Sequence, residues 1–303
     1  MKQVILLTGA NGFLGSTCVS FFNSRNNEQV IALWNNGSER LLSRVNECII
    51  YERCDLLDIE KIDALFKKYP ITAIIHTAAL LPDGKPDYLS RASAVNILAT
   101  SYLVNKAVEY SVKKFIYCST TSVYGFHQCG SDGWKENSEI KTNDIYSWTK
   151  WCGEEALRLA CQKSNMEGLS LRISGIHGPT RTSGAVYQMF MMAKLNEEIN
   201  ISNNTNRFQL VFVAEIIEII HNCLSLESSY EILNIASHTI DSLEILAAEI
   251  IKICNSNSVI INKNYNTTEW IMNTDKLSQI LSFHPQSLKQ RLVEIYQHNF
   301  LKI

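Results

Sequence analysis

The first half of the chain repeats one rhythm, in which a short apolar run leads through a turn into a longer segment of helical periodicity. Unbroken apolar runs of this length are typical of strands buried on both faces of a parallel sheet. The alternation predicts an α/β fold with a doubly wound parallel Rossmann sheet, whose ligand should lie at the carboxyl ends of the strands. The predicted strands are Val4–Thr8, Gln29–Leu33, Cys48–Arg53, Ala73–Thr77, Lys114–Ser119 and Ser170–Ile173.

Four helices are expected between these strands. Asp58 is the predicted N-cap of the second helix, and Asn143 or Asp144 is the predicted N-cap of the fourth. The helical segments are Phe13–Ser24, Ile59–Tyr69, Tyr88–Tyr110 and Ile145–Ser164.

The rhythm breaks after Ile173, where three glycines and a proline cluster between residues 175 and 184. We therefore predict a dinucleotide-binding domain over residues 1–173 and a smaller α/β substrate-binding lobe over residues 174–303, partly interleaved with the first. The lobe should contain helices at Val186–Leu195, Ile216–Leu226, Leu243–Cys254 and Gln286–Asn299, and strands at Gln209–Val213 and Ile232–Ile235.

Composition narrows the class of partner. The 303 residues carry 28 Lys and Arg against 30 Asp and Glu, and without a basic cluster we expect neither nucleic acid nor an anionic membrane as partner. The apolar run at residues 4–7 is too short for a signal peptide and meets a glycine turn, so we interpret it as a strand. Nine scattered cysteines without a C-x-x-C pair favour reduced thiols, no bound metal and a cytoplasmic location.

Three glycines, Gly9, Gly12 and Gly15, follow the first strand directly and open the first helix. Glycines let the chain turn tightly and let its backbone approach a pyrophosphate, whose charge the free N–H groups of a helix start can meet. The spacing differs from the commoner G-x-G-x-x-G pattern, so a simple strand-to-helix turn stays open as the alternative.

The ends of the next strands bear on the cofactor. Dinucleotide sites usually place an acid after the second strand to bind the adenosine ribose, but Trp34 stands there, with Arg40 and Arg44 a few residues on. The pattern slightly favours NADP over NAD. Asp55 should either accept from the adenine amino group or start the following helix. His76 is expected to be a buried, hydrogen-bonded strand residue.

A reactive pair is predicted at the start of the fourth helix, where Tyr146 and Lys150 are four residues apart and share one face. A close ammonium favours the phenolate and lowers the pKa of tyrosine from about 10. Tyr146 could then exchange a proton with a substrate oxygen while a nicotinamide exchanges hydride. A hydroxyl from Ser119–Ser122, at the end of the fifth strand, would hold the same oxygen.

At this point the sequence resembles the extended short-chain dehydrogenase/reductases, also called the NAD-dependent epimerase/dehydratase family. The resemblance spans nearly the whole chain and rests on "TGANGFLG", "CDL", "HTAAL", "VNILAT", "STTSVYG", "YSWTK", "LRISGIHGP" and "NTDKLSQILSFHP". It implies a catalytic set of Thr120, Tyr146 and Lys150. It implies that Asn96 either contacts the ligand or bends its helix. The cofactor contacts it implies are Gly9, Asn11, Gly12, Phe13, Leu14, Gly15, Asp55, Leu56, Ala78, Ala79, Leu80, Tyr146, Lys150 and Ile173.

Departures from the family pattern restrict the reaction. Family 4,6-dehydratases place an Asp-Glu pair after the catalytic threonine, where this chain has Thr121 and Ser122. Members that also epimerise beside the ketone carry a cysteine where Ser122 stands. The resemblance therefore implies hydride transfer alone, as a 4-epimerase or a 4-keto reductase, and the missing ribose acid at Trp34 favours reduction somewhat.

The substrate implied by the family is a nucleotide-activated sugar, with Thr120 and Arg207 as substrate-binding residues. The alternative interpretation of Arg207 is an exposed side chain that contacts no substrate. Two other function classes stay open: a carbonyl reductase of a small molecule other than a sugar, and a non-catalytic dinucleotide-binding regulator. The family also implies a homodimer built on the long helix at residues 88–110, whose circumference is largely apolar.

Overall fold

The computed structural model describes residues 2–35, 46–125, 129, 131–202, 207–237, 241–263, 271–281 and 286–301. Arg40 and Arg44 therefore lie outside the described residues. The chain forms two compact units. The first comprises residues 1–125, 140–172 and 217–233, and the second comprises residues 126–139, 173–216 and 234–303.

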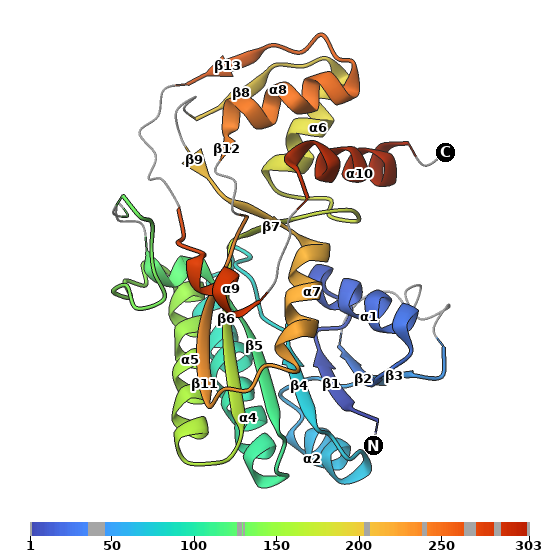
Figure 1. The fold of residues 1–303 in the computed structure, drawn as a ribbon, viewed down its shortest axis with the longest axis vertical. Helices are drawn as coiled ribbons and strands as arrows, with labels where there is room; N and C mark the ends of the chain where they lie inside the picture. Colours follow the sequence, from blue (N-terminus) through green and yellow to red (C-terminus); the bar gives the residue numbers. More distant parts are fainter. Residues whose placement is uncertain are drawn as a thin grey trace. The chain divides into compact units, whose positions relative to one another are not determined.

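A seven-stranded sheet in the order β11-β6-β5-β4-β1-β2-β3 confirms the predicted doubly wound α/β fold (Figure 1). The neighbours β1–β2, β2–β3, β1–β4 and β4–β5 are parallel. Strand order reverses between β1 and β4, which places a switch-point crevice at their carboxyl ends. The strands are β1 (Val4–Thr8), β2 (Gln29–Trp34), β3 (Ile49–Arg53), β4 (Ala73–His76), β5 (Lys114–Thr120), β6 (Glu167–Ile173) and β11 (Tyr230–Ile235).

Helices lie on both faces of this sheet (Figure 1). They are α1 (Phe13–Arg25), α2 (Ile59–Lys68), α3 (Tyr88–Ala92), α4 (Thr100–Glu109), α5 (Ile145–Gln162) and α7 (Val213–Cys223). Asp58 caps α2 by accepting from the Lys61 N–H, and Asp144 caps α5 by accepting from the Ser147 N–H at 2.7 Å. The predicted N-caps are thus confirmed, with Asp144 as the one of the two candidates that acts.

The long helix predicted over residues 88–110 is interrupted. Between α3 and α4 the backbone adopts a π-helical stretch, η2 (Ser93–Ala99), in which Asn96 is buried. A π-helical turn widens the helix locally, and such turns are frequent at functional sites. Apolar periodicity covers both helix types, so it could not reveal this change.

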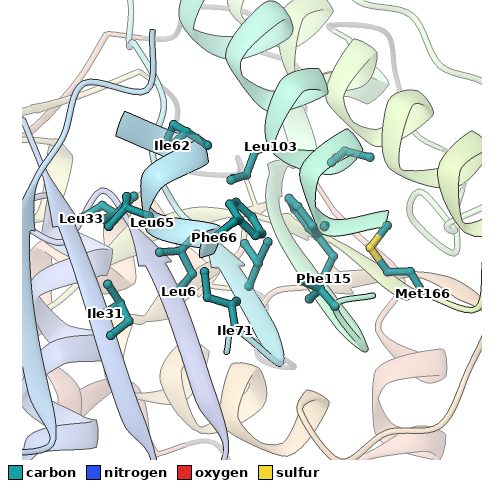
Figure 2. Packing of buried hydrophobic residues seen from close by; sticks show 14 of the residues in the cluster. Leu6, Ile31, Leu33, Ile62, Leu65, Phe66, Ile71, Leu103, Phe115 and Met166 are labelled. Atoms are coloured by element: carbon teal, nitrogen blue, oxygen red, sulfur yellow. The ribbon is translucent and has the colours of Figure 1, made fainter. Parts of the chain in front are cut away.

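The core of the first unit forms between one face of the sheet and helices α2, α4 and α5. Figure 2 shows Leu6, Ile31, Leu33 and Phe115 from the strands packed with Phe66 and its neighbours from the helices. Side chains alternate along a strand, so the intervening residues of β1 point to the opposite face, where they are equally buried. Burial on both faces accounts for the unbroken apolar runs.

The second unit consists of paired short strands and helices around its own core. The strand pairs are β7 (Gly175–His177) with β10 (Leu210–Phe212), β8 (Ile199–Ile201) with β13 (Ile260–Asn262), and β9 (Arg207–Phe208) with β12 (Asp241–Ser242). The helices are α6 (Ala185–Leu195), α8 (Leu243–Cys254), α9 (Asp275–Ile280) and α10 (Leu288–Phe300). Phe190, Phe212, Leu246 and Leu292 belong to the core.

One strand departs from the expected organisation. We assigned Ile232–Ile235 to the second lobe, whereas the observed strand, β11, is the edge strand of the large sheet beside β6. An apolar pattern indicates that a segment forms a strand, but it carries no information about which sheet that strand joins.

Candidate active site

The glycine turn joins β1 to α1. Gly9 has a φ of 72°, in the left-handed region that favours glycine, and a Cβ on it would lie 2.8 Å from the Ala78 nitrogen. A Cβ on Gly15 would lie 2.1 Å from the Gly9 carbonyl oxygen. The turn itself therefore requires these two glycines, whatever binds beside it.

Gly12 is different, because its φ of −72° suits any residue. Among the described residues beyond its two chain neighbours, the Gly9 carbonyl oxygen is the nearest atom that a Cβ there would meet, at 3.2 Å. Gly12 is the N-cap of α1 and provides no side-chain acceptor for the first N–H groups of the helix. Phe13 and Leu14 are the first two residues of this helix. A helix start of this kind suits an anion, so the turn fits a pyrophosphate.

The segment after β4 is held against this turn. Thr77 Oγ1 donates to the Thr8 carbonyl at 2.7 Å, and the Ala78 N–H donates to Thr8 Oγ1. Ala78 and Ala79 follow in this segment with small side chains. The glycine turn and the small-residue segment thus border the same switch point.

Asn96 ties this segment to helix α5. Its Oδ1 accepts from the Leu80 N–H at 2.7 Å, and its Nδ2 donates to the Leu80 carbonyl and to Thr149 Oγ1 at 3.0 Å. Since Thr149 directly precedes Lys150, the structure connects the segment after β4 to the reactive helix. Among the described residues Asn96 is therefore a structural link, in addition to marking the π-helical stretch.

His76 lies in the core as expected. Its ring nitrogens are within 2.6 Å of Thr8 Oγ1 and 2.9 Å of Thr100 Oγ1, and the side chain is fully buried. Burial, with the Lys150 charge nearby, lowers the pKa of His76 to about 3. The imidazole is therefore neutral at physiological pH and joins β1, β4 and α4.

Trp34 and Arg53 end the paired strands β2 and β3, and the Arg53 guanidinium lies 5.4 Å from the centre of the Trp34 ring. Asp55, two residues beyond, accepts from the Leu57 N–H at 2.9 Å and from Asn35 Nδ2 at 2.8 Å. Asp55 is thus a turn residue before α2, as one of its two interpretations had it. The neighbouring Leu56 lies in the same turn.

Thr120 is the last residue of β5 and caps the following 3-10 turn, η3 (Thr121–Tyr124). Its Oγ1 accepts from the Ser122 N–H and donates to Ser122 Oγ, both at 3.2 Å. The side chain is 8% exposed. The cap fixes the Thr120 hydroxyl at the carboxyl end of β5.

Tyr146 and Lys150 lie one turn apart near the start of α5, so their side chains share one helix face. The Lys150 ammonium lies 4.0 Å from the centre of the ring of Tyr117, which belongs to β5. Lys150 therefore lies against the strand that Thr120 ends. This placement makes the end of the strand a candidate active site.

The electrostatics of the pair differ from the expectation. Burial raises the pKa of the Tyr146 phenol above its usual value, with Tyr88, Cys118 and Asp144 adding to the effect. The Lys150 ammonium lies 4.0 Å from the centre of the Tyr117 ring, and burial lowers the pKa of Lys150 to about 8. The predicted lowering of the Tyr146 pKa by Lys150 is thus not seen in the ligand-free chain, because desolvation dominates.

Sequence reasoning missed Tyr117, since an aromatic residue in an apolar strand suggests only a core position. It is buried, and within the described chain its Oη has no hydrogen-bond partner. Two implied contacts belong to the second unit: Ile173 ends β6 as a buried residue, and Arg207 begins β9 opposite Ser242.

The described residues contain neither a metal-binding cluster nor a membrane-spanning helix. No group of three or more His, Cys, Asp or Glu side chains in this part of the chain is arranged to hold a metal ion. Within the same residues, none of the helices combines the length and the apolarity needed to cross a membrane. All nine cysteines are free thiols.

A doubly wound sheet with a glycine turn at its switch point defines a Rossmann-type protein, and a Tyr-Lys pair beside it is typical of the dehydrogenase/reductase class. The chain belongs to the NAD dependent epimerase/dehydratase family, whose family model matches residues 5–236.

Similar proteins include the UDP-glucose 4-epimerase of Bacillus subtilis (strain 168), which is 32% identical over 162 residues, 52% of this chain and 47% of the relative. The chain spans about half the length of the first curated relatives it matches. A UDP-glucose 4-epimerase structure from Thermotoga maritima with UDP-glucose has a TM-score of 0.85 at 21% identity, and one of a UDP-glucuronic acid 4-epimerase from Bacillus cereus with NAD has 0.83 at 22%. Each alignment covers 98% of both chains, and these likenesses confirm the fold.

Proposed function

We propose that this protein transfers hydride at the C4 carbinol or ketone of a nucleotide-activated sugar, with Tyr146 as acid and base. The observation that carries the proposal is the position of Lys150, one helical turn beyond Tyr146 on α5, with its ammonium 4.0 Å from the centre of the Tyr117 ring on β5, the strand that Thr120 ends. In this proposal residues 1–173 bind the dinucleotide and residues 174–303 bind the sugar nucleotide. Family membership supports the class of substrate.

The dinucleotide would be held by the turn at Gly9, Gly12 and Gly15, where an uncapped helix start can bind a pyrophosphate. When bound, its nicotinamide supplies the hydride acceptor or donor. The other residues proposed to contact it are Asn11, Phe13, Leu14, Asp55, Leu56, Ala78, Ala79, Leu80 and Ile173. NAD is the proposed form, since similar structures hold NAD, and the earlier lean to NADP has no support from them.

Tyr146 holds its proton near neutral pH, because burial raises the pKa of the phenol. It is therefore prepared to donate a proton to a carbonyl oxygen, and in the opposite direction it accepts one from a hydroxyl. Thr120 donates a hydrogen bond to the same oxygen. Lys150 supplies positive charge that favours the phenolate as the proton leaves.

The residues after Thr120 restrict the chemistry. Thr121 and Ser122 have no carboxylate to remove water and no thiol to epimerise beside a ketone. Arg207 is proposed to bind the nucleotide phosphates. We further propose a homodimer, as the family resemblance implies, and a cytoplasmic location.

The proposal has two forms, epimerisation at C4 and reduction of a 4-keto sugar, and Trp34 in place of a ribose-binding acid favours reduction somewhat. Native mass spectrometry of the purified protein distinguishes them. Retained dinucleotide with interconversion of a UDP-sugar and its C4 epimer is expected for an epimerase, whereas an empty site with dinucleotide consumption indicates a reductase. Cofactor binding without turnover on any nucleotide sugar or simple carbonyl would contradict both and favour a regulator.

A further inference from the structure

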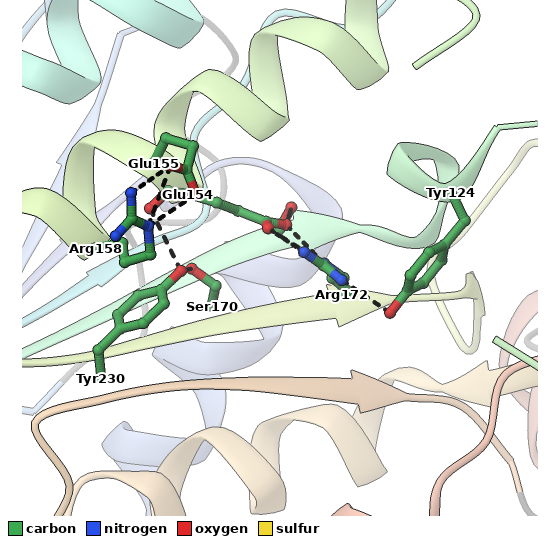
Figure 3. Close-up of polar contacts among 8 residues, drawn as sticks. Tyr124, Glu154, Glu155, Arg158, Ser170, Arg172 and Tyr230 are labelled. Atoms are coloured by element: carbon green, nitrogen blue, oxygen red, sulfur yellow. Dashed lines mark hydrogen bonds and ion pairs between the residues drawn. The ribbon is translucent and has the colours of Figure 1, made fainter. Parts of the chain in front are cut away.

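A buried ion pair lies beside the reactive end of β5, in the first unit. Arg172 Nη2 donates to Glu154 Oε2 at 2.8 Å, and Arg172 Nε lies 3.2 Å from both carboxylate oxygens (Figure 3). The Arg172 and Glu154 side chains are 3% and 1% exposed. Because desolvation can cost as much as such a pair gains, stability alone is a weak reason for its presence.

Two arms extend from this pair to the residues on either side of Thr120. Ser119, which precedes Thr120, donates from Oγ to Glu154 Oε1. Arg172 Nη1 donates to Tyr124 Oη at 3.0 Å, and the guanidinium carbon lies 4.9 Å from the centre of the Tyr124 ring. Tyr124 ends the η3 turn that Thr120 caps. The strand before Thr120 and the turn after it are therefore tied to the same two charges.

The helix that carries Glu154 is itself fixed. Tyr230 Oη lies 2.9 Å from Ser170 Oγ and donates to the Glu154 carbonyl at 3.3 Å, which braces α5 against β6 and β11 (Figure 3). On the other side, a Cβ on Gly153 would lie 2.3 Å from Tyr117 Oη, so α5 packs closely on β5. Glu154, one helical turn beyond Lys150, is thus buried on a helix that is hydrogen-bonded on one side and closely packed on the other.

We propose that Glu154 and Arg172 are positioning residues that hold the Thr120 hydroxyl in place through Ser119 on one side and Tyr124 on the other. The inference rests on the proposed function in so far as Thr120 meets the substrate oxygen. A charged pair suits this task, since the planar guanidinium fork binds a carboxylate in a fixed geometry and still presents further N–H groups to Tyr124.

Two mild variants test the proposal, because each removes one arm and leaves the ion pair intact. Tyr124→Phe removes the acceptor for Arg172, and Ser119→Ala removes the donor to Glu154. The matched control is Glu155→Gln, which neutralises the adjacent glutamate in its partly exposed pair with Arg158 (Figure 3). The first readout is the γ-methyl signal of Thr120 in ¹³C-threonine-labelled protein, assigned with Thr120→Ser.

We expect both variants to shift the Thr120 methyl signal and lower its order parameter, with the fold retained and with Glu155→Gln unchanged. We expect kcat to fall about tenfold to a hundredfold, since small displacements of reacting groups have effects of that size. The dinucleotide Kd should change less than about twofold, since neither arm touches the glycine turn proposed to bind the dinucleotide. Glu154→Gln should cost at least as much kcat, and adding Ser119→Ala to it should cost little more.

An unshifted Thr120 methyl signal in both variants would overturn the positioning role, and so would wild-type kcat in both. The methyl readout needs no turnover, so it decides this point separately from the proposed function. Absence of turnover in the parent protein, with a methyl signal that responds to Tyr124→Phe, would count against the proposed function alone.

Discussion

The Lys150 ammonium lies 4.0 Å from the centre of the Tyr117 ring, inside the first unit and away from water. Cation–π attraction offsets part of the cost of burying the charge. The other charged and titratable groups that act on it are Cys118, Glu154 and His76. Burial still dominates and lowers the pKa of Lys150 to about 8.

Replacing Lys150 by Met should therefore stabilise the chain near neutral pH. The folded-state pKa lies below the unfolded value, so the charged form costs stability below about pH 8, and this cost disappears as pH rises toward 10.5. We expect the free energy of unfolding of Lys150→Met to exceed that of the parent by about 2 kcal/mol at pH 7, with the difference shrinking above pH 8. Denaturant titrations at several pH values measure this. A less stable variant at pH 7 would show that the cation–π contact outweighs desolvation.

Tyr146→Phe should separate proton transfer from binding. The variant keeps the ring in its buried site, so dinucleotide affinity should stay nearly intact while kcat falls by about 10² to 10⁴. Steady-state kinetics and isothermal titration with the dinucleotide provide the two readouts. Tyr110→Phe, on a ring that packs against Phe66, is the matched control and should change neither. Normal activity in Tyr146→Phe would rule out the acid-base assignment.

The glycine turn offers a paired test of its two interpretations. Gly15→Ala would force a Cβ to 2.1 Å from the Gly9 oxygen and should lower the free energy of unfolding by about 2 kcal/mol or more. Gly12→Ala meets that oxygen at 3.2 Å, so the fold should survive, yet the dinucleotide Kd should rise about tenfold or more because the methyl fills the phosphate cradle. Thermal unfolding measures the change in stability, and dinucleotide titration measures the change in Kd. Unchanged affinity in Gly12→Ala would leave the turn a purely structural feature.

Asn96→Leu should uncouple the segment after β4 from α5. It removes the acceptor of the partly buried Leu80 N–H, and we expect a loss of about 1–3 kcal/mol together with weaker dinucleotide binding. Thr149→Val keeps the contacts with Leu80, removes the arm toward α5 together with the bond from Thr149 Oγ1 to the Tyr146 carbonyl, and should cost less. Chemical denaturation of both variants shows which of them loses more free energy of unfolding. Equal losses would mean that the contact with Thr149, and not the contact with Leu80, carries the link.

Trp34→Asp should move cofactor preference toward NAD. A carboxylate at the end of β2 can accept from ribose hydroxyls and repels a 2′-phosphate, so the NADP-to-NAD affinity ratio should fall about tenfold. Trp34→Leu controls for the lost ring, which is 9% exposed and covered by Arg53. The ratio is measured by fluorescence titration. If it is the same in the Asp and Leu variants, residue 34 does not reach the ribose.

Sequence patterns predicted the main sheet well because its strands are long enough to show their burial. Val4–Thr8 and Leu243–Cys254 have the predicted bounds, and Asp58 and Asp144 act as caps because capping is a local property. The two-residue strands β9 and β12 were not predicted, since so short a segment has no period, whereas the three-residue strand β10 falls within the predicted Gln209–Val213. The placement of β11 depends on long-range pairing that no local pattern encodes.

The sequence proposes the residues of the candidate site, but it could not predict their electrostatics. Glycine spacing and the Tyr-Lys separation identify positions, whereas the Tyr146 pKa depends on burial that only the folded chain sets. In the sequence, Glu154 and its neighbour Glu155 look like two solvent-exposed residues on a helix surface. Its buried role appears only when Arg172, 18 residues away, is brought to 2.8 Å.

The π-helical stretch Ser93–Ala99 makes the length of this helix as important as its composition. Removing one residue from it would restore regular α-helical winding and rotate the following residues by about 100° relative to those before. Asn96 could then no longer serve Leu80 and Thr149 together. A single-residue deletion there would leave the apolar content nearly unchanged and would still break the connection between the sheet edge and the reactive helix. We therefore expect this segment to tolerate substitutions far better than changes in its number of residues.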